Sequence, residues 1–284
     1  MKYLLMSIIS GVLILSGCEE YMDVQFDNDS GSKLVVEGAF TTDTTSHTVI
    51  LSRSGDFFEK GDRKMEAGAE ITISDGNSVF SYTEVEPGVY QTDPTAYGMV
   101  GKNYTMTITL DNGTVYSASE KIVELPGIDS VVAISKAGFD QNTGELTQGY
   151  YINYYGPEPE GPGHCYLWNL YIDGKLRSDS IHKQVFSDDE FVDGSYIKDF
   201  EIFFIKESDL LSDTVEIEIE MFSISKAYYD YMLGLMLETV WKGSPWDGPP
   251  ANAVSNISNG ALGYFRASDR KTARTTIIRK LQTD

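Results

Sequence analysis

From Lys33 onward, the chain is a series of short segments in which apolar and polar residues alternate, separated by turn residues. Alternation of this kind places successive side chains on opposite faces of a half-buried sheet, so it predicts β-strands. Asn112-Gly113 lies between two such segments, and both residues tolerate the left-handed backbone of a tight hairpin turn. In the first half of the chain, the pattern predicts strands at 34–40, 48–53, 70–74, 79–84, 88–92, 104–110 and 114–119.

About seven short strands within about 90 residues are typical of a β-sandwich of the immunoglobulin or transthyretin type. Leu125-Pro126-Gly127 interrupts the pattern, and we expect one β-rich domain at 33–125 and a second at 126–284. In the second half, strands are predicted at 130–135, 149–155, 165–172, 200–205, 213–223, 262–267 and 275–279. The segment 213–223 alternates apolar residues with three glutamates, which we interpret as the solvated side of an antiparallel sheet rather than a metal site.

One helix is predicted, at 226–242. Ser225 is suited to cap its start and Gly243 to end it, and aromatic and Met residues recur between them at helical spacing. Such a stripe most often packs across a sheet. The sequence therefore predicts a mainly β protein with two sandwich-like domains and one main α-helix, in the second domain.

The first 18 residues indicate export and lipidation. Lys2 precedes an apolar core of about 13 residues, which is too short to span a bilayer and is typical of a signal peptide. The string Leu15-Ser16-Gly17-Cys18 resembles the bacterial lipobox, in which the Cys is acylated and becomes the mature N-terminus. We therefore expect a signal peptide at 1–17, a lipid anchor on Cys18 and a tether at 18–32, which places the protein at the outer membrane and the cell surface.

Composition excludes several functions. The chain has 43 acidic and 22 basic residues, a formal net charge of -21, so it lacks the basic surface that nucleic acid requires and favours cationic or neutral ligands over anionic ones. It has three His, and the sequence contains none of the common catalytic, metal-binding or nucleotide-binding motifs. Cys165 beside His164 invites a metal or nucleophile hypothesis, but its alternating context favours a buried strand Cys. We predict no catalytic residue, cofactor or metal.

Aromatic residues on a loop give the main binding signal. Trp241 lies just before the Gly/Pro-rich stretch 243–250 and Trp246 lies within it, where rigid rings can stack on a flat ligand or anchor a partner. The alternative for Trp241 is that it continues the apolar stripe of the helix. Trp246 is therefore the sharper candidate.

The order of several short motifs resembles DUF4249, a family of Bacteroidota lipoproteins known as a domain of unknown function. Besides Cys18, the resemblance rests on the segments 34–38, 67–73, 88–90 and 100–104 and on a C-terminal string whose marked positions are Asn256, Asn259, Gly260, Gly263, Tyr264 and Phe265. The resemblance implies a gene setting beside TonB-dependent outer-membrane transporters and no established catalytic residues. The C-terminal string itself we interpret as structural, because Gly allows tight backbone geometry and Asn satisfies turn amides.

We therefore expect a non-enzymatic surface lipoprotein that helps a TonB-dependent transporter to capture a small-molecule, glycan or peptide ligand. One alternative is a surface hydrolase acting on glycan or peptide, because 43 acids offer many carboxylate pairs and the sequence fixes no separation between them. Another is a structural or adhesive surface module. Absence of a nucleophile or metal motif favours binding over catalysis.

Overall fold

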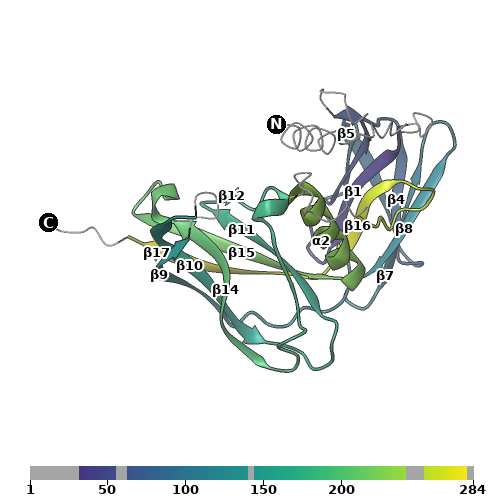
Figure 1. The fold of residues 1–284 in the computed structure, drawn as a ribbon. Coiled ribbons are helices and arrows are strands. Elements are labelled where there is room, and N and C mark those ends of the chain that lie inside the picture. The colour runs from purple at the N-terminus through teal and green to yellow at the C-terminus, as the bar shows by residue number, and fades with distance from the viewer. Residues whose placement is uncertain (1–31, 56–62, 140–143, 241–252, 280–284) are drawn as a thin grey trace, which may run out of the picture. The chain divides into compact units, whose positions relative to one another are not determined.

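The computed structural model describes residues 32–55, 63–139, 144–240 and 253–279. Within these ranges the protein is mainly β, with three sheets and one α-helix, which confirms the predicted fold class (Figure 1). All of the predicted strands are present, and several are longer than predicted. No helix in the described part of the chain is both long and apolar enough to cross a lipid bilayer.

The first sheet has nine strands and is nearly closed into a barrel. In chain order the strands are β1 (Leu34–Thr41), β2 (Thr48–Arg53), β3 (Lys64–Met65), β4 (Glu70–Ser74), β5 (Val79–Glu86), β6 (Val89–Thr92), β7 (Asn103–Thr109), β8 (Val115–Lys121) and β16 (Leu262–Ser268). They are arranged in the order β16-β1-β2-β6-β5-β4-β7-β8, with β3 paired to β2. At the two ends of this order, the Tyr264 hydroxyl of β16 donates to Glu120 of β8 over 2.7 Å, so side chains bridge the remaining gap.

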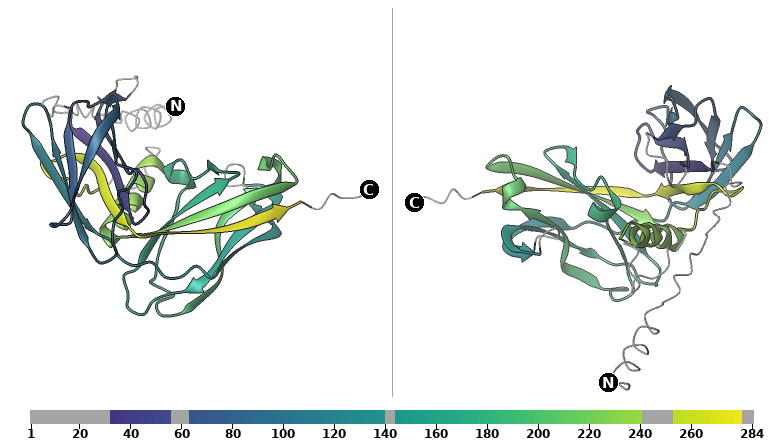
Figure 2. Two further views of the ribbon diagram at one scale, coloured as in Figure 1. Left: turned by 180° about the vertical axis from the view of Figure 1, so that it is seen from behind. Right: turned by 45° about the horizontal axis from the view of Figure 1, so that its top comes forward.

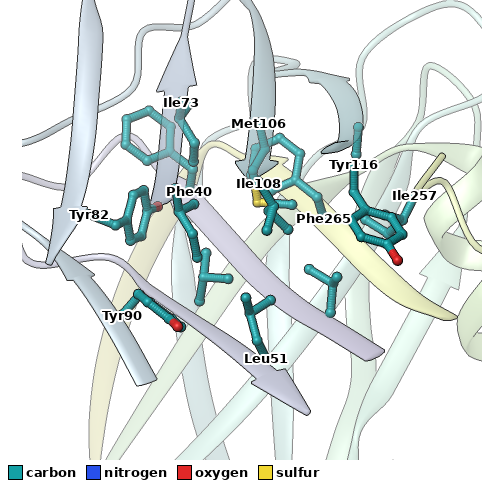
Figure 3. Close-up of a cluster of buried hydrophobic side chains, with 14 of the residues drawn as sticks. Phe40, Leu51, Ile73, Tyr82, Tyr90, Met106, Ile108, Tyr116, Ile257 and Phe265 are labelled. Carbon is teal, nitrogen blue, oxygen red and sulfur yellow. The ribbon is translucent and has the colours of Figure 1, made fainter. Parts of the chain in front are cut away.

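Alternating side chains fill the inside of this sheet. In β8, for example, Tyr116, Ala118 and Glu120 are buried while the residues between them are exposed. Figure 3 shows side chains from several strands meeting in one cluster, with Phe40 and Phe265 near its middle. Burying each such large apolar side chain contributes about 1.5–3 kcal/mol to stability. The inward-facing positions, every second residue of a strand, are therefore mostly apolar, and this two-residue period predicted the strands well.

The C-terminal part of the chain returns to complete the first sheet. Strand β16 pairs in parallel with β1, with Val36 opposite Gly263, and Ile257 and Phe265 lie in the first core. This pairing covers an edge of β1 that would otherwise expose unpaired backbone groups. The division into domains at 33–125 and 126–284 stays a prediction, but residues after Leu125 contribute to the first core as well as to the second.

The remaining strands form two antiparallel sheets. One contains β9 (Ser130–Phe139), β10 (Leu146–Pro157) and β14 (Tyr196–Lys206), and the other contains β11 (Cys165–Ile172), β12 (Lys175–Leu176), β13 (Val185–Asp188), β15 (Thr214–Ile224) and β17 (Arg270–Ile278). Two short 3-10 turns, η1 (Ile181–Lys183) and η2 (Glu207–Asp209), lie between strands. Tyr154 of the smaller sheet contacts Trp168 of the larger one, and both belong to one buried cluster, as in a sandwich. Figure 2 shows β16 continuing into β17, which joins the first sheet to the larger of these two.

The glutamates of β15 show how far the alternating pattern holds. Glu216 is exposed and Glu218 is half-buried, as the solvated face of the strand requires, but Glu220 is buried. Glu220 accepts a hydrogen bond from Arg270 Nε over 3.1 Å, so a neighbouring strand supplies the opposite charge that makes its burial tolerable.

The predicted helix is α2 (Lys226–Val240), and its last two predicted residues, 241–242, lie outside the described residues. Ser225 caps it as predicted, because its Oγ accepts the Tyr228 backbone N–H over 3.1 Å. Met232 packs in a buried cluster with Cys165. The helix therefore covers the face of the larger sheet that points away from the sandwich core.

Candidate functional site

The residues predicted to anchor the protein or contact a partner lie outside the described residues. This applies to Cys18 and to both loop tryptophans, Trp241 and Trp246. Their roles stay predictions. The C-terminal motif residues, in contrast, are all described.

Asn256 forms two hydrogen bonds with the backbone of a single strand residue. Its Oδ1 accepts the Phe265 N–H over 3.0 Å, and its Nδ2 donates to the Phe265 carbonyl over 2.8 Å. The amide thus acts as a substitute for a neighbouring strand along part of β16. The rest of the motif makes close backbone contacts: Asn259 Nδ2 donates to the Val115 carbonyl over 2.6 Å, and Gly263 has a φ of 88° against the backbone of β1.

The motif also surrounds a buried carboxylate. Glu120 accepts hydrogen bonds from Tyr264 over 2.7 Å and from Ser225 and Asn256 over 3.3 Å each. Burial raises the pKa of Glu120, and these hydrogen bonds together with the charge of Arg266 offset only part of that effect. The polar groups of the motif are therefore used to join β8, β16 and the start of α2.

A cleft of about 530 Å³ opens at one end of the sandwich, between the smaller and the larger sheet. Its apolar lining comes mainly from β11 and β14 and includes Leu170, Ile172, Val185, Ile202, Phe203, Phe204 and Ile205. Phe139 and Leu211 also line it, and both are largely exposed, at 67% and 89%. Large apolar side chains exposed beside an apolar cleft are typical of a binding site.

The polar side chains that line this cleft are mostly basic, although the whole chain is acidic. Among the described residues, Asp209 is the one acid that lines it, and the basic residues are Arg177, His182, Lys183 and Lys206. Lys183 also pairs with Asp179 over 2.8 Å at the surface. A cleft lined by both apolar and basic side chains is suited to a ligand with an apolar body and an anionic head.

A second polar cluster lies at the opposite end of β11, roughly 20 Å away along the strand. Here Glu158, His164 and Asp189 place one potential metal-ligating atom each within 4.8 Å of the others. Burial raises the pKa of Glu158. Burial also acts to raise the pKa of Asp189, but hydrogen bonds from the backbone of His164 and Gly163 and from the His164 side chain together outweigh it and lower that pKa.

Cys165, next to this cluster, is a buried strand residue as predicted. Burial raises the pKa of its thiol to about 11, so the thiol is protonated at neutral pH and is a poor nucleophile. The structure thus gives no support to a nucleophilic role for this cysteine.

Sequence reasoning did not identify the cleft. One signal was available: the segment 175–183 carries Lys175, Arg177 and Lys183 in a chain where acids outnumber bases by 43 to 22. For the second cluster, His164 was considered only together with Cys165. Glu158 was not singled out, because only folding brings these positions together.

A family model described as "Domain of unknown function (DUF4249)" matches residues 19–274 of the chain. Among solved structures, a chain described as "Cytokine receptor complex - Crystal form 1A" aligns with 8% identity over 86% of this chain and 95% of that one, with a TM-score of 0.24. A similarity this low carries no argument about fold or function. No curated protein sequence matches the chain.

Proposed function

The chain belongs to the DUF4249 family, and from that premise we propose that it is a non-enzymatic, lipid-anchored accessory protein of a Bacteroidota outer membrane. In this proposal it captures an amphipathic anion in the cleft and presents it to a TonB-dependent transporter. The observation that supports the proposal is the set of basic side chains around an apolar cleft on an otherwise acidic chain.

The cleft suits such a ligand in size and in chemistry. Its volume of about 530 Å³ lies within the range of about 300–1,000 Å³ that is usual for small-molecule sites. Buried Ile202 and Ile205 offer apolar surface to a hydrocarbon or aromatic body. Arg177 and Lys206 supply cations for a carboxylate or phosphate head.

Three ligands with one chain length separate these contributions. Titration calorimetry of the purified protein with dodecanoate, dodecanol and dodecylamine should give the lowest Kd for dodecanoate and the highest for dodecylamine. The apolar body is the same in all three, so the differences report the charge at the cleft. Equal affinity for the amine and the carboxylate would refute the proposed ligand class.

Two substitutions test where the ligand binds. Phe139→Ala removes an exposed ring at the cleft, and losing roughly 40 Å² of apolar contact costs about 1 kcal/mol, or about fivefold in Kd. Phe191→Ala is the matched control, because Phe191 is 90% exposed and does not line the cleft. Arg177→Gln should weaken dodecanoate binding and leave dodecanol binding unchanged. Similar effects of the two phenylalanine variants would place the ligand elsewhere.

The transporter partnership requires its own test. The tagged lipoprotein, purified from detergent-solubilised membranes of the native host, should retain a TonB-dependent transporter that mass spectrometry identifies. Trp246→Ala should weaken that complex by at least about 1 kcal/mol without unfolding the protein, because rigid aromatic side chains lose little entropy on binding and often anchor interfaces. If no transporter co-purifies, the accessory role is wrong even if the cleft binds dodecanoate.

A further inference from the structure

A mixed cluster of one histidine and two carboxylates lies at the end of the sandwich opposite the cleft. Its members come from two segments: Glu158 and His164 from the connection between β10 and β11, and Asp189 from the residue after β13. The backbone fixes their positions. Asp189 accepts the N–H of Gly163 and of His164, both over 2.9 Å, and its own N–H donates to the His164 carbonyl over 3.1 Å.

Two of the distances within the cluster are close to those of a tetrahedral metal site, and all three ligand atoms lie within 4.8 Å of one another. His164 Nδ1 lies 3.2 Å from Asp189 Oδ2 and 3.6 Å from Glu158 Oε1. In a tetrahedron with metal–ligand bonds of about 2.0–2.1 Å, neighbouring ligand atoms are about 3.3 Å apart. The 3.2 Å contact is also a hydrogen bond, longer than the about 2.7–2.9 Å of a strong charge-assisted one, and the 3.6 Å contact is too long for a hydrogen bond.

An independent observation also points to a missing cation. Glu158 is 5% exposed, and its Oε1 accepts the Tyr166 hydroxyl over 2.6 Å, but its Oε2 is buried without a hydrogen-bond partner. A buried carboxylate oxygen without a partner is costly, and two carboxylates around a single imidazole leave an excess of negative charge. A divalent cation balances this charge, and coordination through both carboxylate oxygens of Glu158 also gives Oε2 a partner.

The donor set selects the kind of metal. Ca²⁺ and Mg²⁺ prefer oxygen ligands throughout, whereas Zn²⁺ combines histidine nitrogen with carboxylate oxygen. The His164 side chain is 23% exposed, which leaves access for the ion and room for a water as fourth ligand. We propose that Glu158, His164 and Asp189 bind one Zn²⁺, which ties the connection between β10 and β11 to the end of β13.

The alternative is that a protonated His164 itself neutralises the carboxylates. Titration calorimetry with ZnCl₂ on the purified full chain, after treatment with a chelator, distinguishes the two. We expect one Zn²⁺ per chain. Glu158→Gln and His164→Gln should weaken binding at least tenfold, and Glu190→Gln, which removes an exposed acid next to Asp189, should not. Failure of the wild type to bind Zn²⁺ stoichiometrically would overturn the site.

Co²⁺ provides a second readout that does not depend on stability. Bound to the wild type, Co²⁺ should give the intense visible absorption of a four-coordinate ion, and His164→Gln should abolish it. His164 is partly exposed, so this variant is expected to fold, and far-UV circular dichroism checks that it does. An unchanged Co²⁺ spectrum in His164→Gln would overturn the proposal. Neither measurement involves the cleft, so these experiments test the metal site independently of the proposed function.

Discussion

Gly263 and Gly260 offer a matched test of how the C-terminal motif holds the first sheet. Both have a left-handed backbone, with φ of 88° and 70°. A Cβ at Gly260 would meet no atom within 4 Å, whereas a Cβ at Gly263 would overlap the Val36 carbonyl oxygen and lie 2.8 Å from the Val36 backbone N and C. Alanine at either position therefore costs backbone strain, but only at Gly263 does it also displace the neighbouring strand.

The expected losses in the free energy of unfolding follow from this difference. Gly260→Ala should lower the free energy of unfolding by about 1–2 kcal/mol, the usual cost of a left-handed alanine. Gly263→Ala should lower it by at least about 4 kcal/mol, because β16 must move away from β1 and Phe265, which is fully buried, loses packing. Against a total stability of about 5–15 kcal/mol, the second loss is severe.

Equilibrium unfolding in urea, followed by circular dichroism, measures both values on variants purified in parallel. Hydrogen exchange should locate the change, because the amides of β1 should lose protection in Gly263→Ala and keep it in Gly260→Ala. If the two variants lose the same stability to within about 0.5 kcal/mol, the close approach of β16 to β1 does not contribute as argued.

Three further predictions concern the motif and the anchor. Asn256→Ala should destabilise the protein by about 2–4 kcal/mol in urea unfolding, because it leaves the N–H and the carbonyl of Phe265 without partners. Burial raises the folded-state pKa of Glu120 above its unfolded value, so the wild type loses stability as the pH rises from the unfolded pKa through the folded one. The urea midpoint of Glu120→Gln should therefore rise relative to wild type over that window and stay level above it, and a constant difference from about pH 4 to 8 would contradict this. Cys18→Ala should yield a soluble protein or an uncleaved precursor, measured by membrane fractionation and intact mass.

The sequence predicted those strands whose two faces differ in environment. The alternation in β8 and β15 results from one buried and one solvated face, so the predicted bounds of these strands were close to the observed ones. Strands β3 and β12 have two residues each, too few to show any period. The parallel pairing of β16 with β1 joins positions more than 200 residues apart, and no local pattern records such a contact.

The candidate sites were less predictable than the fold, because each is assembled from separate segments. Phe139 ends one strand, Arg177 follows another and Lys206 ends a third, and each alone resembles an ordinary surface residue. Likewise, Glu158 and His164 are six residues apart, and Asp189 follows 25 residues later, which matches no metal-binding motif. A loop held by backbone hydrogen bonds creates that cluster, and such loops leave little trace in a single sequence.

The net charge of -21 predicted cationic or neutral ligands, whereas the ligand proposed for the cleft is an anion. The dependence of binding on ionic strength distinguishes the two. The Debye length is about 8–10 Å at physiological salt, so acids on distant strands are screened while basic groups beside the ligand act at contact. If the basic side chains of the cleft dominate, raising NaCl from about 50 to 500 mM should weaken dodecanoate binding. If the net charge dominates, the same change screens a repulsion and should strengthen it. Calorimetry across that range therefore distinguishes the two cases by the direction in which Kd changes with salt. A Kd that falls as NaCl rises would refute the role assigned to Arg177 and Lys206.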